Sequence, residues 1–336
     1  MEFIQNLNHE VLLFIVFNLI VIFLLVLDLG VLSRGEHSHM SFRKAFVWTL
    51  IWIGVSMAFA GFIYLYDTNP ADPGSGKKKA MEFIAAYLLE KSLSVDNLFV
   101  FIMIFQSFRI ETDRQANILK WGIIGAVILR AVMILLGAAL VAKFHWILYF
   151  FGAILLYTAF KMFFHEEDEE KEFDPEEHIV YRTLKKMIPL TKNSNGEDFF
   201  ARIDGKLFAT PMFVVLVLIE TSDIVFAFDS IPAVFSVSES PFIVYTSNIF
   251  AILGLRALFF MISGIMNLFE HLQTGVSIVL AFVGVKMLLP LVSPYLVGEP
   301  IHISINVSLS VILVCLTVSI LVSIPGYLRQ KEENSK

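Results

Sequence analysis

The sequence is poor in cysteine and in charged residues. Cys315 is the only cysteine among 336 residues, which excludes a disulfide within the chain and any cluster of thiolate metal ligands. Charged residues make up 17% of the chain, whereas hydrophobic residues make up 57% and the mean hydropathy is +0.74. A large soluble protein would show shorter apolar runs with amphipathic periodicity. The low content of charged residues and the high content of hydrophobic residues favour a protein that is embedded in a membrane.

Long apolar stretches recur along the whole chain. A helix that crosses a bilayer needs roughly 20 mostly apolar residues. Nine stretches meet this requirement: 11–32, 45–66, 80–107, 119–141, 145–164, 207–235, 242–266, 275–293 and 302–325. The sequence therefore predicts an all-α polytopic membrane protein with about nine transmembrane helices.

The loops between these stretches indicate an orientation. Residues 1–10 hold no lysine or arginine and no small-residue cleavage site follows the first stretch, so we expect a retained helix rather than a signal peptide. With the N-terminus outside, the cytoplasmic loops and tail carry sixteen lysines and arginines, and the outside loops carry four. Basic residues are enriched in cytoplasmic loops, so we expect the N-terminus outside and the C-terminus in the cytoplasm. The lysine run 77–79 is the one feature that argues against this orientation.

Two copies of one polar pattern lie inside the apolar stretches. The pattern is an acid followed by an arginine and then a lysine, and it reads Glu90, Arg130, Lys161 in the first copy and Glu220, Arg256, Lys286 in the second. Charged residues are rare in membrane spans, so coincidence among apolar helices is the weaker explanation. Each copy contains three spans, an odd number, so the second copy is expected to insert in the opposite orientation. Inverted repeats of this type place a binding site between the halves near the bilayer midplane.

The repeat divides the chain into five parts. Residues 1–79 hold the first two helices, 80–164 the first copy, 165–206 a polar loop, 207–293 the second copy, and 294–336 the last helix and the tail. The loop contains twelve acidic residues and is too polar to bury a core, so it is predicted to be a flexible cytoplasmic linker.

Acidic residues gather in the opening helices of the two copies. Carboxylates here are accompanied by hydroxyl and amide groups, and no histidine lies squarely in these helices. Hard oxygen ligands suit Mg²⁺, Ca²⁺ and Mn²⁺ rather than Zn²⁺ or Cu⁺. The candidate metal ligands are Glu90, Asp96, Glu220, Asp223 and Asp229. The supporting polar residues are Ser92, Asn97, Ser222, Ser230 and, as a further carboxylate or only a local charge balance, Asp28.

Basic residues in the spans offer a different interpretation of these acids. The predicted charge partners are Arg130, Lys161, Arg256 and Lys286. Buried charges are normally paired, so each acid can also be a purely structural ion-pair member. The alignment of the two copies stays open as well, because one register places Glu90 opposite Glu220 and the other places it opposite Asp223.

The spacing of the acids predicts broken helices. Glu90 and Asp96 are six residues apart, as are Asp223 and Asp229, and on a regular helix such pairs do not share a face. Pro232 follows Asp229 by three residues and would weaken the helix there. We therefore expect local unwinding near Asp229 and near Asp96, which would let backbone carbonyls join the side chains around a cation.

The stretches 90–97 and 220–233 resemble the TerC family of integral membrane proteins, which is named for tellurium resistance and includes the Alx-type proteins. The resemblance runs from Asp28 to the last span. It implies a LysE-like transporter architecture and, for several members, export of manganese from the cytoplasm. It also implies that the acids of both stretches, Glu90, Asp96, Glu220, Asp223 and Asp229, bind or conduct the metal.

The expected function is therefore that of a secondary transporter in the bacterial inner membrane that exports Mn²⁺, with protons as the natural counter-substrate. We expect no cofactor, no nucleic-acid partner and contact with the lipid bilayer, while a homo-oligomer stays open. An alternative from another class is a membrane scaffold for tellurite or envelope-stress resistance that acts through the loop 165–206. An intramembrane enzyme is disfavoured, because aspartyl chemistry usually needs two carboxylates that share a proton, whereas the acids here come with basic partners and a repeat.

Overall fold

The computed structural model describes residues 2–31, 41–66, 74–164, 179–191, 198–203, 205–264 and 272–333. Most of these residues are helical. The helices are α1 (Glu2–Val31), α2 (Phe42–Tyr66), α3 (Ser75–Ser107), α4 (Thr112–Lys143), α5 (Ile147–Phe164), α6 (Ile179–Met187), α7 (Pro211–Phe235), α8 (Pro241–Ile252), α9 (Leu255–Ser263), α10 (Leu272–Val297) and α11 (Ile305–Glu333). Strands β1 (Phe200–Ile203) and β2 (Lys206–Ala209) form an antiparallel pair.

Each of the nine predicted apolar stretches contains a described helix. The stretch 207–235 begins in strand β2, and the stretch 242–266 is divided into α8 and α9 with a bend of 45°. By length and composition, five described helices are able to cross a membrane, or six when the bent pair counts as one span. The apolar parts of α1 (Phe14–Asp28) and α5 (Ile147–Phe163) are shorter. The structure thus supports a polytopic helical membrane protein, while the count of nine spans and the inverted repeat stay predictions.

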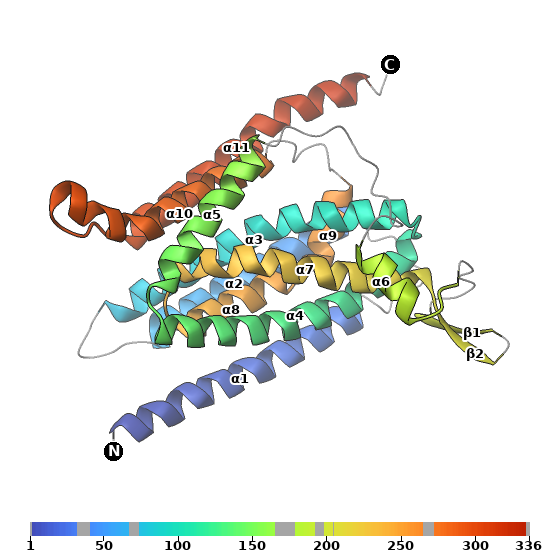
Figure 1. The fold of residues 1–336 in the computed structure, drawn as a ribbon, viewed down its shortest axis with the longest axis horizontal. Coiled ribbons are helices and arrows are strands. Elements are labelled where there is room, and N and C mark those ends of the chain that lie inside the picture. The colour runs from blue at the N-terminus through green and yellow to red at the C-terminus, as the bar shows by residue number, and fades with distance from the viewer. Residues whose placement is uncertain are drawn as a thin grey trace.

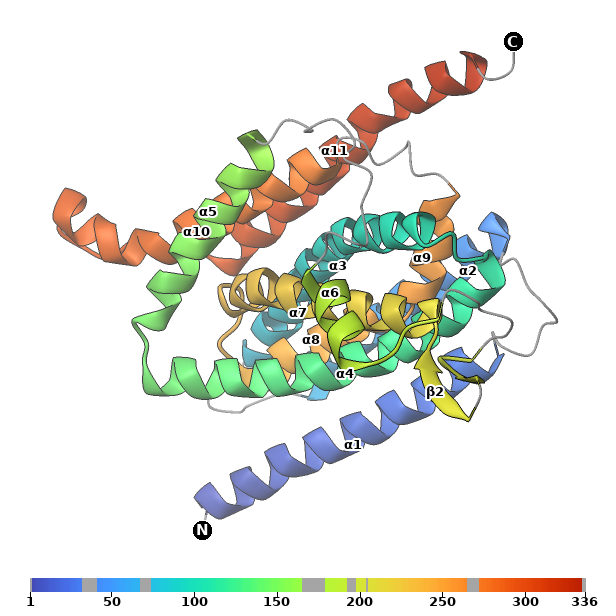
Figure 2. The ribbon, with the colours of Figure 1, turned by 45° about the vertical axis from the view of Figure 1, so that its right-hand side comes forward.

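The helices form a central bundle with a second group beside it (Figure 1). The bundle contains α2, α3, α4, α7, α8 and α9, and the second group contains α5, α10 and α11. Contacts of α5 with α7 and of α11 with α3 join the two groups. Both views place α1 along the side of the bundle that is opposite to the second group (Figures 1 and 2).

Aromatic rings join α1 to the bundle. The ring centroid of Phe250 on α8 lies 4.8 Å from that of Phe59 on α2 and 5.8 Å from that of Phe17 on α1. The hydroxyl of Tyr245 donates a 2.7 Å hydrogen bond to Oδ1 of Asn18. Aromatic pairs at such distances attract each other beyond the effect of burial alone. The many phenylalanines of the sequence therefore serve partly to attach α1.

The outward helix faces expose large apolar side chains. Examples are Leu19 and Phe23 on α1, Leu136 on α4, Phe160 on α5 and Leu321 on α11. Soluble monomers rarely expose contiguous apolar patches of this extent. These faces are suited to contact with lipid.

Glycines bring the third helices of the two sequence copies together. A Cβ atom on Gly284 of α10 would lie 2.9 Å from the carbonyl oxygen of Gly152 on α5, and one on Gly152 would lie 3.2 Å from the carbonyl oxygen of Gly284. Small residues allow such close backbone approach between membrane helices. Helices α5 and α10 consequently pack directly against each other.

The predicted unwinding is wrong, because α3 and α7 continue as helices through Asp96 and Asp229. Pro232 lies near the C-terminal end of α7, where one missing backbone N–H does not interrupt the rest of the helix. The break lies instead between α8 and α9, where Gly254 has φ +80°. Glycine occupies this left-handed conformation without the cost that a Cβ atom would add.

The loop 165–206 contains regular structure in its described part. Helix α6 packs against α7, and the ring of Tyr181 lies 6.3 Å from that of Phe108. The hydroxyl of Thr210 donates a 2.9 Å hydrogen bond to the carbonyl of Asp198. The acidic composition of the loop did not predict α6 or the β-hairpin.

Candidate functional site

Arg130 of α4 lies at the centre of a buried polar cluster. Its side chain is 1% exposed, and the carboxylates of Glu90 and Asp223 belong to residues that are 0% and 4% exposed. Nη2 of Arg130 lies 3.1 Å from Oδ1 of Asp223, and Nε lies 3.4 Å from Oδ2. Nη1 forms an ion pair with Glu90 and donates a 3.5 Å hydrogen bond to Oδ1 of Asn248. One base therefore joins carboxylates of α3 and α7, one from each copy of the sequence pattern.

Helical periodicity extends this cluster along two facing helices. Glu90, Ser94 and Asn97 follow one another at spacings of four and three on α3, and Asp223 and Ser230 are seven apart on α7. These spacings place the side chains on one face of each helix. The hydroxyls of Ser94 and Ser230 are buried and have no hydrogen-bond partner among the described atoms. A water molecule or a cation would satisfy such oxygens, which cost about 1–3 kcal/mol each when left unpaired.

Glu220 adds a third carboxylate near the cluster. It lies close enough to Asp223 for the two negative charges to interact, and its Oε2 is buried without a partner among the described atoms. Both residues line a cavity of about 20 Å³ between α3, α4, α7 and α9. This volume accommodates one water molecule or a bare ion of similar size. Gly125 of α4 provides space for Glu220, because a Cβ atom there would overlap the carboxylate.

The acids of this site outnumber the bases. If Glu90, Asp223 and Glu220 are all ionised, Arg130 balances one of three negative charges. Within the part of the chain that the structure describes, no three acidic, histidine or cysteine side chains are close enough to hold a metal ion by themselves. The guanidinium of Arg130 lies between Glu90 and Asp223 and fills the position that a shared cation would need.

Asp28 belongs to a second buried cluster. Nη2 of Arg256 lies 3.9 Å from Oδ2 of Asp28 and also donates to the main-chain carbonyl of Asp28. Lys91 interacts electrostatically with Asp28 and donates a 3.1 Å hydrogen bond from Nζ to the carbonyl of Ala251. That carbonyl lies in the last turn of α8, where backbone acceptors lack helical partners. Asp28 therefore balances charge rather than joining the Arg130 cluster.

Asp229 lies apart from both clusters. It faces α5, where Oγ1 of Thr158 donates a 3.1 Å hydrogen bond to its Oδ1. Lys161, an exposed residue of α5, interacts with it electrostatically. Lys286 contacts none of the five predicted ligands among the described side chains, and its Nζ donates a 2.9 Å hydrogen bond to the carbonyl of Ser236. The copies of the pattern thus do not place their lysines in equivalent surroundings.

The other predicted site residues include two serines that do not join the Arg130 cluster. Ser92 and Ser222 donate hydrogen bonds to carbonyls of their own helices, at 2.7 Å to Leu89 and at 2.9 Å to Leu218. Asp96 lies on α3, and its side chain lies outside those that the structure describes. Glu90 and Asp223, which one of the two registers places opposite each other, both contact Arg130.

Two members of the site escaped the sequence analysis. Asn248 is a fully buried amide that follows Thr246 and Ser247 within the apolar stretch 242–266, and this polar run was a usable signal. Gly125 offered no signal, because nothing in the sequence separates it from other glycines of the spans. Its role depends on the packing of α4 against α7.

Comparison with known sequences identifies related membrane proteins. The profile of the integral membrane protein TerC family matches residues 75–333. A protein of Photorhabdus laumondii subsp. laumondii, named as a proposed membrane-bound redox modulator, Alx, is 42% identical over 308 residues, which cover 92% of this chain and 93% of the relative. The protein of the same name from Escherichia coli K12 is 39% identical over 307 residues, with coverages of 91% and 92%.

A membrane protein of Myxococcus xanthus, STKORF319, is 46% identical over 267 residues, which cover 80% of each chain. No solved structure matches the chain significantly.

Proposed function

Because the chain belongs to the TerC family of integral membrane proteins, we propose that it exports a divalent metal ion, foremost Mn²⁺, from the cytoplasm. The observation that carries this proposal is the buried group of Glu90, Asp223 and Glu220 with one arginine, beside a cavity of about 20 Å³. Ionisable groups at membrane depth are costly and usually mark ion pathways. An excess of negative charge at such a site attracts a cation.

The available ligands favour a hard cation. Carboxylate oxygens of three residues, the amide oxygen of Asn248 and the unpaired hydroxyl of Ser94 lie on the helices that enclose the site. Oxygen ligands suit Mn²⁺, Mg²⁺ and Ca²⁺. Manganese is the member of this set that the family resemblance favours.

Arg130 connects metal binding to movement. A divalent ion that binds Glu90 and Asp223 together must displace the guanidinium, because both would fill the same space. Since Arg130 is attached to α4, its displacement changes the contacts of α4 with α3 and α7. A ligand shifts a conformational equilibrium only by such differences in contact between two states. We propose that this exchange of cations starts the rocking of the two sequence copies against each other, as an inverted repeat would allow.

Protons complete the proposed cycle as counter-substrate. Returning the empty site through the membrane with all carboxylates charged would be costly. Uptake of protons removes these charges, so each exported metal ion is exchanged for protons from the outside.

Transport into proteoliposomes tests the proposal. Purified full-length protein is reconstituted, and uptake of Mn²⁺, Ca²⁺ and Mg²⁺ is compared while the internal pH is recorded. We expect Mn²⁺ uptake above that of protein-free vesicles, with an opposite movement of protons. Absence of flux for all three metals in vesicles that contain folded protein would refute metal transport.

A scaffold is the second candidate, and the structured part of the loop 165–206 favours it. Helix α6 and the β-hairpin rest on the end of α7 and offer a defined surface to a partner. Deletion of 165–206 with the spans intact separates the two functions. A scaffold loses its resistance phenotype, whereas a transporter still lowers cellular manganese.

The names of the Alx relatives suggest a redox role, which this chain would have to fulfil without paired thiols. Cys315 is its only cysteine. Transport of a redox-active metal is the route to redox modulation that its residues favour.

A further inference from the structure

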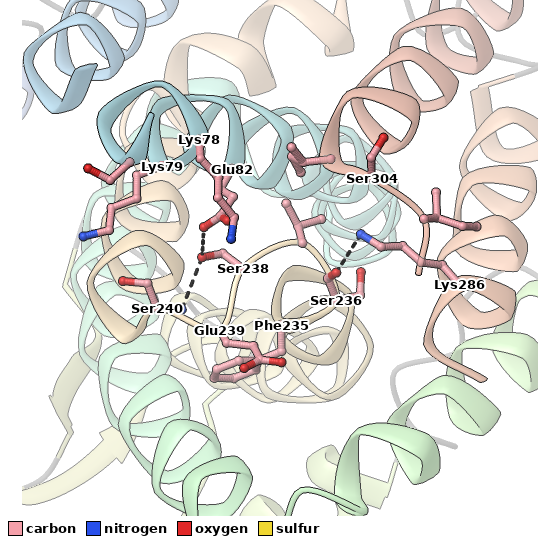
Figure 3. Close-up of a pocket in the computed structure, with 14 residues that line it drawn as sticks. Lys78, Lys79, Glu82, Phe235, Ser236, Ser238, Glu239, Ser240, Lys286 and Ser304 are labelled. Atoms are coloured by element: carbon pink, nitrogen blue, oxygen red, sulfur yellow. Dashed lines mark hydrogen bonds between the residues drawn. The ribbon is translucent and has the colours of Figure 1, made fainter. Parts of the chain in front are cut away.

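A large pocket opens at the end of the bundle that the loop charges predict to be outside (Figure 3). Its volume is about 720 Å³, and its walls come from the N-terminal end of α3, the segment 236–240, α10 and the start of α11. On α3, Glu82 lines this pocket and precedes Glu90 of the Arg130 cluster by eight residues. Eight helical residues span about 12 Å, so the pocket is separate from that cluster.

Lysines outnumber acidic residues in the lining of the pocket by three to two. Lys78 and Lys79 line it from α3, and Lys286 reaches it from α10 on the other side (Figure 3). The two acids of the lining are Glu82 and Glu239, so the five charged side chains sum to a formal charge of +1. Glu82 accepts a 2.6 Å hydrogen bond from the hydroxyl of Ser238 and interacts electrostatically with Lys286. Glu82 is thus already engaged in contacts within the protein. The pocket keeps an excess of positive charge.

Helix ends add to this positive character. Helices α3, α8 and α11 all begin at the pocket, with Ser75, Ser240 and Ile305 in its lining. The N-cap residue of α8, Ser240, provides no side-chain hydrogen bond to the first turn. The first amides of a helix point outward and carry partial positive charge, which favours anions. The hydroxyls of the lining serines offer further donors.

We propose that this pocket binds a phosphate-type oxyanion, supplied either by free inorganic phosphate or by the headgroup of an anionic phospholipid. The ammonium group of Lys78, that of Lys286 across the pocket and the serine hydroxyls are donors that the oxygens of such a group accept. The site also gives a reason for the lysine run 77–79, which conflicts with the distribution of basic residues elsewhere. Anion binding in this pocket would explain why lysines lie on the side of the membrane that is predicted to be outside.

Binding of inorganic phosphate to the full-length protein in detergent tests the free-anion source. Calorimetry at low ionic strength compares the wild type with Lys78→Gln and Lys286→Gln. The matched control is Lys77→Gln, which removes the same charge from an exposed neighbour outside the pocket lining. Loss of one charged hydrogen bond should weaken binding about tenfold in the two pocket variants and less than about twofold in the control.

The lipid source is tested in the same variants. Protein is exchanged into nanodiscs of phosphatidylcholine with a small fraction of phosphatidylglycerol, and the phosphatidylglycerol retained after delipidation is measured by mass spectrometry. If the headgroup is the ligand, Lys78→Gln and Lys286→Gln lose this lipid and Lys77→Gln keeps it.

Three results would overturn the proposal. One is the absence of both phosphate and phosphatidylglycerol binding in the wild type. Another is an equal loss in Lys77→Gln and Lys78→Gln, which would indicate only general charge attraction. The third is occupation by Mn²⁺ that depends on Glu82 and excludes phosphate. Because Lys286 also bonds Ser236, the exposed Lys78 gives the decisive variant if Lys286→Gln folds poorly.

Discussion

Arg130 and Arg256 occupy corresponding positions in the two copies of the sequence pattern, but they make different contacts. Arg130 bonds two side-chain carboxylates and an amide, from three different helices. Arg256 bonds the main chain of α1 and the single carboxylate of Asp28. Lys91 shares the charge of Asp28, so this second cluster holds two bases and one acid among its described members.

The difference shows that the two copies of the pattern place their arginines in different charge surroundings. The Arg130 cluster has excess acid and draws on both copies, which suits an exchangeable cation. The Arg256 cluster has excess base and fixes α1 to the bend between α8 and α9. We therefore expect function to depend on the first cluster and assembly of the helices to depend on the second.

Transport should distinguish the two clusters most strongly. Asp223→Asn is expected to abolish Mn²⁺ uptake in proteoliposomes, because it removes a carboxylate that faces Arg130 and the small cavity. Asp28→Asn is expected to retain most of the uptake, because asparagine keeps the main-chain carbonyl that Arg256 bonds. Equal loss in both variants would remove the functional difference between the clusters.

Stability provides the second comparison. Arg130→Ala leaves Glu90 and Asp223 buried without a base, and the loss of one partner from a buried pair costs about 3–5 kcal/mol. Arg256→Ala should cost less, because Lys91 still interacts with Asp28. Thermal unfolding in detergent measures both. A larger decrease in midpoint for Arg256→Ala would contradict the assignment of charges.

A substitution at the bend between α8 and α9, beside the second cluster, should change the stability by a smaller amount. Gly254→Ala places a Cβ atom in left-handed backbone, at about 1–2 kcal/mol, and also against the ring of Trp52. Gly298→Ala is the control, because Gly298 has φ +85° but no atom within 4 Å of the added Cβ. We expect Gly254→Ala to lower the unfolding midpoint further. A decrease of the same size in both variants would show that contact with Trp52 adds nothing.

A glycine beside the first cluster allows a test of whether Glu220 contributes to metal affinity. Gly125→Ala would displace the carboxylate of Glu220, and we expect the apparent Mn²⁺ affinity in transport to fall about tenfold. Gly61→Ala adds the same methyl group on α2 with no atom within 4 Å, outside the lining of the small cavity, and should leave the affinity unchanged. Unchanged affinity in Gly125→Ala would exclude Glu220 from the site.

The sequence predicted the helices and the charged residues of the candidate site, but not Asn248 or Gly125. Apolar length predicted the helices because backbone groups in lipid must bond within their own segment, and this constraint is local. The sequence also singled out Glu90, Asp223 and Arg130, since charged residues are rare in apolar helices. The location of the helix break was mispredicted, because Pro232 is tolerated near a helix end whereas Gly254 looked ordinary. The separation of Asp229 from the other acids depends on α5 packing beside α7, which spacing along one helix does not show.

The close crossing of Gly152 and Gly284 limits how the molecule is able to deform. The side chains of Leu156 and Met287 pack around this close backbone crossing, so rotation of either helix about its axis would disturb these contacts. Helices α5 and α10, one from each copy of the pattern, should therefore keep their relative position when other helices move. Under the proposed transport cycle, we expect opening toward either face of the membrane to separate α4 from α7, where Arg130 contacts Glu90 and Asp223.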